Sequence, residues 1–259
     1  MQQEVVVPEL PLLHHPHLEF HSAPEIPHPD LTSSALFSGI SPNDCHEILS
    51  WARPRTFVRN EMLFLQGEPL DKLVLIQTGS VKVTQTNSDG NEVILWVNGY
   101  GETVGAHVES RDQSHTTSAR AMETCKALVW EYKRFQMLTT RFPQIPVNLG
   151  AILCGRIVEL ERRFREISTE NASQRLALAL LRLLDCVGKT NREGIRVALS
   201  REELGQLTGS TIFTISRILS KWAKAGMVVR RREAVVIRDA AQLAAIVSTA
   251  RNQAGHQRV

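Results

Sequence analysis

Residues 200–222, SREELGQLTGSTIFTISRILSKW, predict two short helices joined by a tight turn. Ser200 and Glu203 have the spacing of a capping box, in which a hydroxyl and a carboxylate each accept a backbone N–H at a helix start. Gly209 supplies the turn, because glycine tolerates the backbone conformations that tight turns need. Gly205 is small at the point where the two helices would cross. The segment therefore predicts a closely packed helical hairpin.

The second of these predicted helices is amphipathic, with an apolar stripe at i, i+3, i+4 and i+7 and a mostly polar opposite face. This is the arrangement of a helix-turn-helix over residues 201–220, whose second helix enters the major groove of DNA. On the outer face, Arg217 can donate two hydrogen bonds to guanine, and Thr211 and Thr214 are placed to hold phosphates. Generic helical hairpins share the pattern and are the alternative. The stripe consists of Ile215, Ile218, Leu219 and Trp222.

Beyond the second helix, AGMVVRRREAVVIRD places three arginines between two β-prone runs. This predicts a wing hairpin whose tip grips the DNA backbone; a solvated run of charge is the alternative. Residues 1–170 hold 15 Lys/Arg and 21 Asp/Glu, a net charge of −6, and residues 171–259 hold 15 and 6, a net charge of +9. A basic C-terminal third favours contact with a polyanion. The alternative is an uneven distribution of surface charge, which would give the same net charges. The residues expected to contact DNA are Ser210, Thr211, Phe213, Thr214, Ser216, Arg217, Lys221, Arg230, Arg231 and Arg232.

Residues 31–145 have the texture of an antiparallel β domain. Short β-prone runs such as KLVLIQT, SVKVTQT and NEVILWV alternate with glycine-containing turns. In SVKVTQT, Val81 and Val83 are expected to point inward, and Lys82 and Thr84 to point outward. The pattern predicts a sandwich or barrel in front of the helical segment.

Residues 146–170 switch to a helical period, with apolar residues three and four positions apart and charged residues on the other faces. A narrow seam of this kind is either a stripe in the chain's own core or one half of a two-stranded coiled coil. Its place between a β domain and a basic domain favours dimerisation, but both interpretations stay open. The seam consists of Leu149, Leu153, Ile157, Leu160, Phe164 and Ile167.

Residues 1–30 are rich in proline and histidine, and the prolines prevent a regular element from fixing metal ligands in place. We expect a flexible tail, with metal binding by its histidines as the alternative. The N-terminus lacks the features of a secretory signal, and no apolar run is long enough to span a bilayer. The four cysteines lie far apart, without a C-x-x-C pair. We therefore expect a cytoplasmic protein without disulfides, a metal site or a membrane contact.

The order of these parts resembles the Crp/Fnr family of bacterial transcription regulators. The resemblance covers about Leu36 to Ala250, is strongest in SREELGQLTGSTIFTISRILSKWAKAGMVV, and includes FLQGEPLDKLVLIQTGSVKV, similar to the family's opening hairpins. It implies an α+β fold: an N-terminal antiparallel β-roll like that of cyclic-nucleotide-binding domains, a long dimerisation helix and a C-terminal winged helix-turn-helix. The implied parts are a sensor domain (31–145), the dimerisation helix (146–170), a DNA-binding domain (171–250) and a C-terminal tail (251–259).

The resemblance also implies the partners. These are double-stranded DNA with a near-palindromic operator, a second copy of the chain, and RNA polymerase if the protein is an activator. An enzyme is a competing class, but the sequence has no P-loop, no G-x-S-x-G and no H-E-x-x-H motif. A nucleotide-binding signalling adaptor that does not touch DNA is a third class, and the basic C-terminal third argues against it.

At one position the chain departs from the family's pattern for reading DNA. Members that read a G·C-containing half-site use an acidic residue where this chain has Phe213, together with an arginine that matches Arg217. Phenylalanine cannot accept a hydrogen bond from cytosine, but it can pack on a thymine methyl group. We therefore expect an altered operator in which Arg217 still reads guanine. The alternative is that a neighbouring element buries Phe213.

The sensor domain departs from the cyclic-AMP-binding branch as well. That branch places a glutamate on the ribose and an Arg-Ser pair on the phosphate, whereas this chain has Ala106, His115 and Thr116 at those places. An anionic phosphate in a partly buried site needs a fixed cation, so we do not expect tight binding of cyclic AMP.

No other cofactor is expected. Cys125 lies near one ligand position of the iron–sulfur branch, but the N-terminal cysteines of that branch are absent. Haem is a minor alternative, because His107 falls near a haem-ligand position while the partner cysteine position is a glycine. The effector therefore stays open, and the candidate pocket residues are Gly105, Ala106, His107, His115, Thr116 and Thr117.

Overall fold

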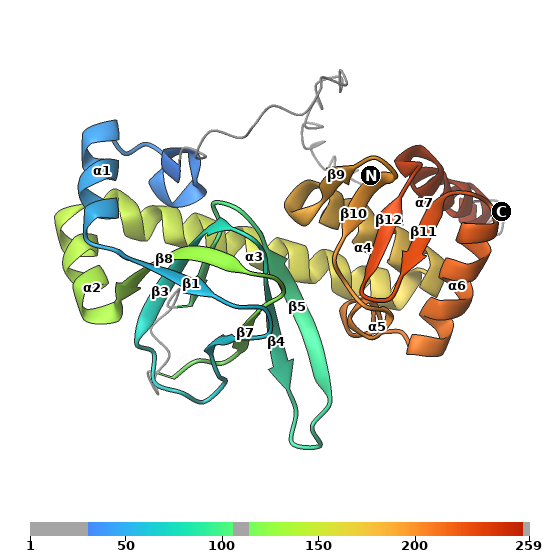
Figure 1. The fold of residues 1–259 in the computed structure, drawn as a ribbon, viewed down its shortest axis with the longest axis horizontal. Helices are drawn as coiled ribbons and strands as arrows, with labels where there is room; N and C mark the ends of the chain where they lie inside the picture. Colours follow the sequence, from blue (N-terminus) through green and yellow to red (C-terminus); the bar gives the residue numbers. More distant parts are fainter. Residues whose placement is uncertain (1–30, 106–113, 256–259) are drawn as a thin grey trace, which may run out of the picture.

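The computed structural model describes residues 31–105 and 114–255, so the tail expected at residues 1–30 lies outside the described residues (Figure 1). Its first part contains the strands β1 (Arg53–Phe57), β2 (Met62–Phe64), β3 (Lys72–Thr78), β4 (Val81–Thr86), β5 (Glu92–Asn98), β6 (Thr103–Gly105), β7 (Ser118–Ala121) and β8 (Cys125–Glu131). They form two four-stranded antiparallel sheets, in the orders β1-β8-β3-β6 and β2-β7-β4-β5. Apolar side chains of both sheets share one core cluster, including Phe57, Val74 and Val83. The predicted antiparallel β-roll is confirmed.

Strand β4 follows the predicted alternation only at its start. Val81 and Val83 are buried and Lys82 is half-buried, but Thr84 is buried, and its predicted outward direction is wrong. The pairing of β4 with β5 shifts register between Val83 and Thr84. A bulge of this kind redirects the next side chain, and local alternation in the sequence does not reveal it.

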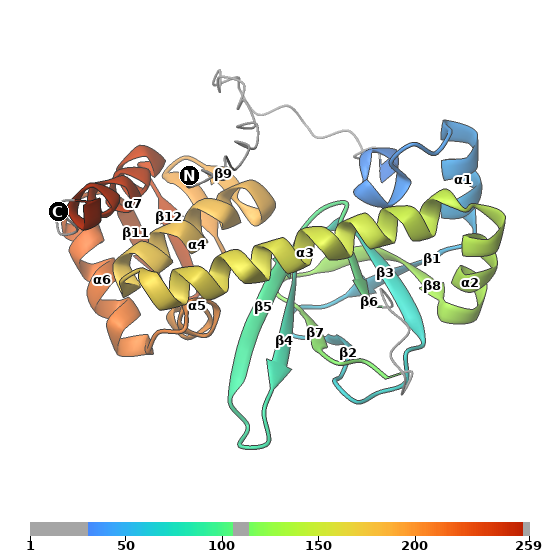
Figure 2. The same ribbon diagram turned by 180° about the vertical axis from the view of Figure 1, so that it is seen from behind.

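The helices of the first part lie at one end of the β-roll. Two 3-10 turns (Leu31–Ser33 and Ala35–Phe37) and helix α1 (Pro42–Ser50) precede the strands, and helix α2 (Tyr132–Arg141) follows them. Next comes α3 (Gln144–Thr169), the long helix expected at residues 146–170. Its start is fixed by Asn148, whose amide donates to the carbonyls of Leu36 and Ser38 at 2.8 Å each. From there α3 runs the length of the molecule into the second part (Figure 2).

The second part contains α4 (Ala172–Val187), β9 (Lys189–Asn191), β10 (Gly194–Val197), α5 (Arg201–Thr208), α6 (Ile212–Lys224), β11 (Val228–Arg231), β12 (Ala234–Ile237) and α7 (Ala240–Gly255). Its antiparallel sheet has the order β11-β12-β10-β9. The two helices and the β11–β12 hairpin confirm the predicted winged helix-turn-helix. Helix α7 continues to Gly255, so residues 251–255, which were expected to form a tail, are helical in the structure.

The β-roll and the C-terminal domain pack directly on each other. Ile94 and Val97 of β5 belong to the same hydrophobic cluster as Leu183 of α4 and Leu204 of α5. Strand β5 accordingly lies beside α5 (Figures 1 and 2). The two domains are therefore joined by a shared core as well as by helix α3.

Candidate DNA-binding surface and effector pocket

The helix-turn-helix has the local geometry that its sequence predicts. The Ser200 hydroxyl accepts from the Glu203 backbone N–H at 3.1 Å, and the Glu203 carboxylate accepts from the Ser200 N–H at 2.8 Å, which completes the capping box. Gly209 ends α5 in the left-handed conformation, with φ at 59°. A Cβ at Gly205 would lie 2.6 Å from the Ser210 carbonyl oxygen, so only glycine allows this close approach.

Helix α6 buries the predicted stripe and exposes the opposite face. Ile215, Leu219 and Trp222 are buried in the core of the domain, and Ile218 is partly buried against it. The Thr211 side chain caps the helix by accepting from the Thr214 N–H at 3.2 Å, and the two hydroxyls lie 3.1 Å apart. The first turn of α6 is thereby fixed before any DNA is present.

Phe213 and Arg217 project from the outer face of α6. The Phe213 side chain is 83% exposed, so the alternative that a neighbouring element buries it is wrong. Arg217 lies one turn further along the helix, is exposed, and makes no ion pair within the described residues. Ser216 is half-buried and Lys221 is exposed beside them. An apolar ring and a free guanidinium therefore occupy the part of the helix that reads bases in a helix-turn-helix.

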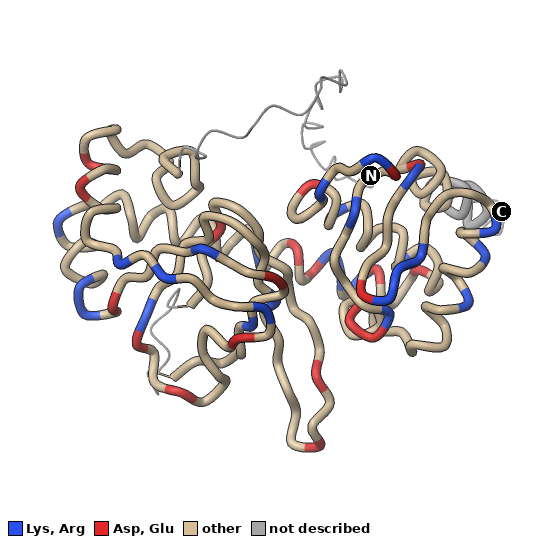
Figure 3. The backbone as a smooth tube through the Cα atoms, in the orientation of Figure 1, with Lys and Arg blue, Asp and Glu red and all other residues tan. Residues whose placement is uncertain are grey.

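The predicted wing is a β-hairpin in the structure, but its three arginines have different surroundings. Arg230 Nη1 donates to the Ser220 hydroxyl of α6 at 2.6 Å, which ties the wing to the recognition helix. Arg231 pairs with both oxygens of Glu193 at 2.6 Å each, which offsets part of its charge. Arg232 lies exposed in the turn at the tip. Lysines and arginines follow α6 and the wing on one side of the domain (Figure 3).

Sequence reasoning missed Arg175, which organises the turn between α5 and α6. From the first turn of α4, its guanidinium donates to the Thr208 carbonyl at 2.9 Å, the Gly209 carbonyl at 3.3 Å and the Ser210 hydroxyl at 3.2 Å. Ser210, which was expected to contact DNA, is thus also a partner of Arg175. The one available signal was a single arginine among the small and apolar residues that open α4.

A cavity of about 400 Å³ lies between the β-roll and helix α3. It brings together Gly105, His115, Thr116 and Thr117 from the candidate effector pocket, and Trp96 lines it as well. The two other candidates, Ala106 and His107, lie outside the described residues. The predicted pocket residues that the structure describes therefore line one cavity.

His115 provides no fixed positive charge in this cavity. Its ring is buried and stacks on Phe64, with the centroids 3.8 Å apart. Burial lowers the pKa of His115, and the nearby Lys72 lowers it further, against the opposing effect of Asp71, whose carboxylate lies 3.8 Å from Nε2. The imidazole is therefore neutral near pH 7.

Comparison with known proteins gives the family. Residues 54–142 match the model of the cyclic nucleotide-binding domain, and residues 174–246 match that of the Crp-like helix-turn-helix domain. The cyclic AMP receptor protein of Thermus thermophilus is 30% identical over 215 residues, which cover 82% of this chain and 96% of that protein. The chain belongs to the Crp/Fnr family of transcription regulators.

Further relatives have the same architecture. The fumarate and nitrate reduction regulatory protein of Salmonella typhimurium is 26% identical over 205 residues, which cover 78% of this chain and 81% of that protein. The structure of the c-di-GMP-responsive global regulator CLP of Xanthomonas campestris has a TM-score of 0.65 at 23% identity and covers 77% of this chain and 100% of its own. At that identity, the likeness shows the fold alone. No helix in the described parts of the chain has the length and hydropathy to cross a membrane.

The seam of α3 divides into two faces in this Crp/Fnr regulator. Leu149 is buried in the chain's own core, so its predicted place at a dimer interface is wrong. Leu153 and Leu160 line the cavity against the β-roll. Ile157 also lines this cavity but is largely exposed, as are Phe164 and Ile167. The core interpretation therefore holds for Leu149, and dimerisation stays a prediction for the exposed residues of the helix.

Proposed function

We propose that this Crp/Fnr regulator binds double-stranded DNA as a homodimer and acts on transcription in the cytoplasm through that binding rather than through catalysis. The observation that carries the proposal is the outer face of α6, where Phe213 and Arg217 are exposed while Arg175 and the Ser220–Arg230 contact hold the helix in place. A helix fixed in this way loses little conformational entropy when it enters a groove. RNA polymerase would be a further partner if the protein is an activator.

The dimer is supported by the outer face of α3. Val147, Cys154, Ile157, Val158 and Phe164 are exposed on this face. Several of them recur seven residues apart, which is the repeat of a two-stranded coiled coil. A second copy of α3 would cover this face. The two recognition helices would then lie about 34–36 Å apart and read the two halves of a near-palindrome.

The proposal is tested by isolating the genomic fragments that the full-length protein retains. The affinity for the most enriched fragment is then measured by fluorescence anisotropy at several salt concentrations. Binding through phosphates should weaken by about 10³-fold or more between 50 and 200 mM salt. Replacing Arg217 by Ala should weaken specific binding by roughly 5- to 100-fold for each base that the helix no longer reads.

Arg134→Ala is the matched control, because Arg134 is exposed on α2 in the sensor domain. This variant should bind like the wild type. If Arg217→Ala leaves both affinity and sequence preference unchanged, α6 does not read the operator, and the proposed function is wrong.

We propose further that this regulator does not bind cyclic AMP tightly. The neutral His115, buried against Phe64, stands where the cyclic-AMP-binding branch has its phosphate-binding arginine. An anionic phosphate there would be desolvated without a positive partner. Calorimetric titration with cyclic AMP should give no constant in the micromolar range or tighter, and such a constant would refute this part of the proposal. No haem or iron–sulfur cluster is proposed either, and the absorbance spectrum of the purified protein tests that.

A further inference from the structure

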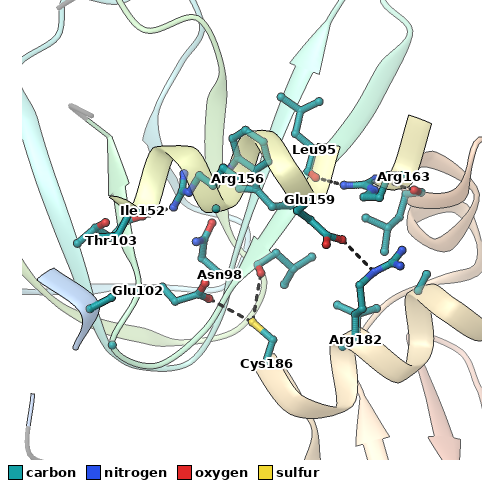
Figure 4. A pocket seen from close by; sticks show the side chains of 18 residues that line it. Leu95, Asn98, Glu102, Thr103, Ile152, Arg156, Glu159, Arg163, Arg182 and Cys186 are labelled. Atoms are coloured by element: carbon teal, nitrogen blue, oxygen red, sulfur yellow. Dashed lines mark hydrogen bonds and ion pairs between the residues drawn. The ribbon is translucent and has the colours of Figure 1, made fainter. Parts of the chain in front are cut away.

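A second cavity of about 360 Å³ lies where the β-roll, helix α3 and the C-terminal domain meet (Figure 4). Its walls include Asn98 of β5, Glu102 of the following turn, Arg156 of α3 and Cys186 of α4. Leu207 of α5 closes it on the side of the helix-turn-helix. The cavity is therefore built from both domains, and a molecule in it would touch both.

Arg156 is the side chain of this cavity on which an anion would bind. Its Nη2 donates to the Thr103 carbonyl at 2.6 Å, and its guanidinium lies 5.0 Å from the centre of the Trp96 ring. Among residues 31–105 and 114–255, no carboxylate oxygen lies within 4.0 Å of a guanidinium nitrogen of Arg156, so Arg156 forms no ion pair there. Burial lowers the pKa of this guanidinium, and the more distant Glu102 only partly opposes the effect. A half-buried guanidinium without an acidic partner favours the binding of an anion.

The two other arginines at the cavity have partners. Arg163 donates to the carbonyls of Ile94 and Leu95 in β5 and of Leu207 in α5. Arg182 pairs with Glu159 at 3.1 Å and with Glu166 at 2.7 Å. These two arginines hold the walls together, whereas Nε and Nη1 of Arg156 have no hydrogen-bond acceptor among the described residues and could bind a ligand.

Asn98 supplies a second, independent observation. Its side chain is 2% exposed, and its Oδ1 accepts no hydrogen bond in the described structure. A buried acceptor without a partner is rare, because it has lost its water without replacement. Figure 4 shows Asn98 and Arg156 at the same part of the pocket. The pocket is therefore lined by free donors and by a free acceptor of the described residues.

We propose that this interdomain cavity binds a small organic acid that carries a hydroxyl or amino group. Its carboxylate would lie on Arg156, and its hydroxyl or amino group would donate to Asn98. Its apolar body would pack against Ile152, Leu183 and Leu207. The volume suits a molecule of the size of a substituted aromatic acid.

This inference goes beyond the proposed function, because it concerns a different cavity and does not require DNA binding. Asn98, Leu183 and Leu207 line the interdomain cavity, whereas His115, Thr116 and Gln85 line the effector pocket. Arg156 and Trp96 line both. A molecule in the interdomain cavity would alter the fit between the β-roll and the helix-turn-helix.

The test uses full-length protein without DNA and three probes: salicylate, 4-hydroxybenzoate and 4-aminobenzoate. The melting temperature and the calorimetric heat are measured with each. A probe that binds should raise Tm by roughly 5–10 °C at about 100 times its Kd. The uncharged 4-hydroxybenzyl alcohol should give no comparable shift, because it lacks the carboxylate for Arg156.

Four variants locate the binding. Arg156→Gln should weaken the bound probe at least about tenfold, because the charged hydrogen bond to the carboxylate is removed. Asn98→Leu should weaken it while leaving Tm of the free protein unchanged or higher, since it removes an unpaired buried acceptor. Gln85→Ala, at the effector pocket alone, and Arg134→Gln, on α2, should bind like the wild type.

The Asn98→Leu result keeps the test decisive even if Arg156→Gln folds poorly. No Tm shift with any of the three acids overturns the proposal. So does a probe whose binding is abolished in Gln85→Ala but kept in Asn98→Leu, because it would then occupy the effector pocket.

Discussion

At the scale of single residues, the outer face of α6 keeps the arginine with which Crp/Fnr members read guanine. It has a phenylalanine where members that read a G·C-containing half-site have an acidic residue. Arg217 presents two donors, which match guanine O6 and N7. Phe213, one turn earlier and 83% exposed, presents only apolar carbon and hydrogen to the groove. Apolar surface this large is costly to leave in water, so contact with a thymine methyl group would stabilise the complex. A partner that presents methyl groups would therefore account for the exposure of Phe213.

Replacing Phe213 by Glu should change the base pair that the helix prefers at this position. A carboxylate accepts from cytosine N4, so we expect the favoured base pair at one position of each half-site to change from T·A to C·G. The change should be worth about 1–3 kcal/mol of discrimination. Selection of binding sites from a random DNA pool, done in parallel for wild type and variant, measures it. Identical selected sites would show that Phe213 does not face a base.

The sequence predicted that Phe213 and Arg217 lie on the outer face of α6, because a buried stripe on a helix fixes what lies on its other face. It did not predict Arg175 as the organiser of the turn. The partners of Arg175 are backbone carbonyls of Thr208 and Gly209, more than thirty residues away in the chain. Carbonyl groups occur at every residue, so nothing in the sequence marks which of them an arginine will bind.

At the scale of elements, Arg175 links the start of α4 to the turn between α5 and α6. Arg175→Met keeps the length of the side chain but leaves the Thr208 carbonyl without this donor. We expect the free energy of unfolding to fall by about 2 kcal/mol and Tm by roughly 4–8 °C. DNA affinity should fall with it, although Arg175 lies outside the predicted contact face. Thermal melts and anisotropy measure both, and the exposed Arg192→Met should change neither.

Helix α3 shows what the spacing of apolar residues can predict and what it cannot. Spacing identified the apolar positions, but it did not show that they have different neighbours. Leu149 packs into the core next to α1 and α2, while Phe164 is 74% exposed. A helix that extends beyond its own domain packs against different elements along its length. The sequence predicts which side of the helix is apolar, but not which element packs against it.

Introducing a charge on the exposed face should separate the proposed dimer. In Phe164→Glu, two carboxylates would meet within an apolar seam, and their desolvation opposes association. Sedimentation should show a shift from dimer to monomer, with weaker binding to a near-palindromic operator. Met137→Glu places the same charge at an exposed apolar position of α2 and should leave the dimer intact. A Phe164→Glu variant that stays dimeric would assign the interface to another surface.

At the scale of the whole molecule, the order of the domains followed from the sequence, but their contact did not. The Lys82–Glu203 ion pair, at 2.8 Å, joins residues 121 positions apart. Strand β4 and helix α5 were each predicted from local patterns that contain no information about the other. Glu203 was assigned to the capping box alone, and in the structure it has a second role as a link between domains.

This double role permits a clean test of the contact between the domains. Burial raises the pKa of Glu203, but the hydrogen bond and charge of Lys82 and the bond from the Ser200 N–H outweigh it, so the pKa lies below its usual value. A lowered pKa means stability that is present above the pKa of the unfolded chain and disappears as the pH falls through that of the folded protein. Glu203→Gln keeps a capping side chain and removes the charge.

We therefore expect Glu203→Gln to be less stable than the wild type at pH 7 by about 1 kcal/mol, because the pair is partly exposed. The difference should fade as the pH falls from about 5 through the lowered pKa of the folded carboxylate, because the wild-type side chain is then protonated as well. Melting curves of both proteins across this range measure it, with the exposed Glu202→Gln as control. A difference that is independent of pH would mean that Glu203 acts only as a helix cap, and that its charge plays no part in joining the two domains.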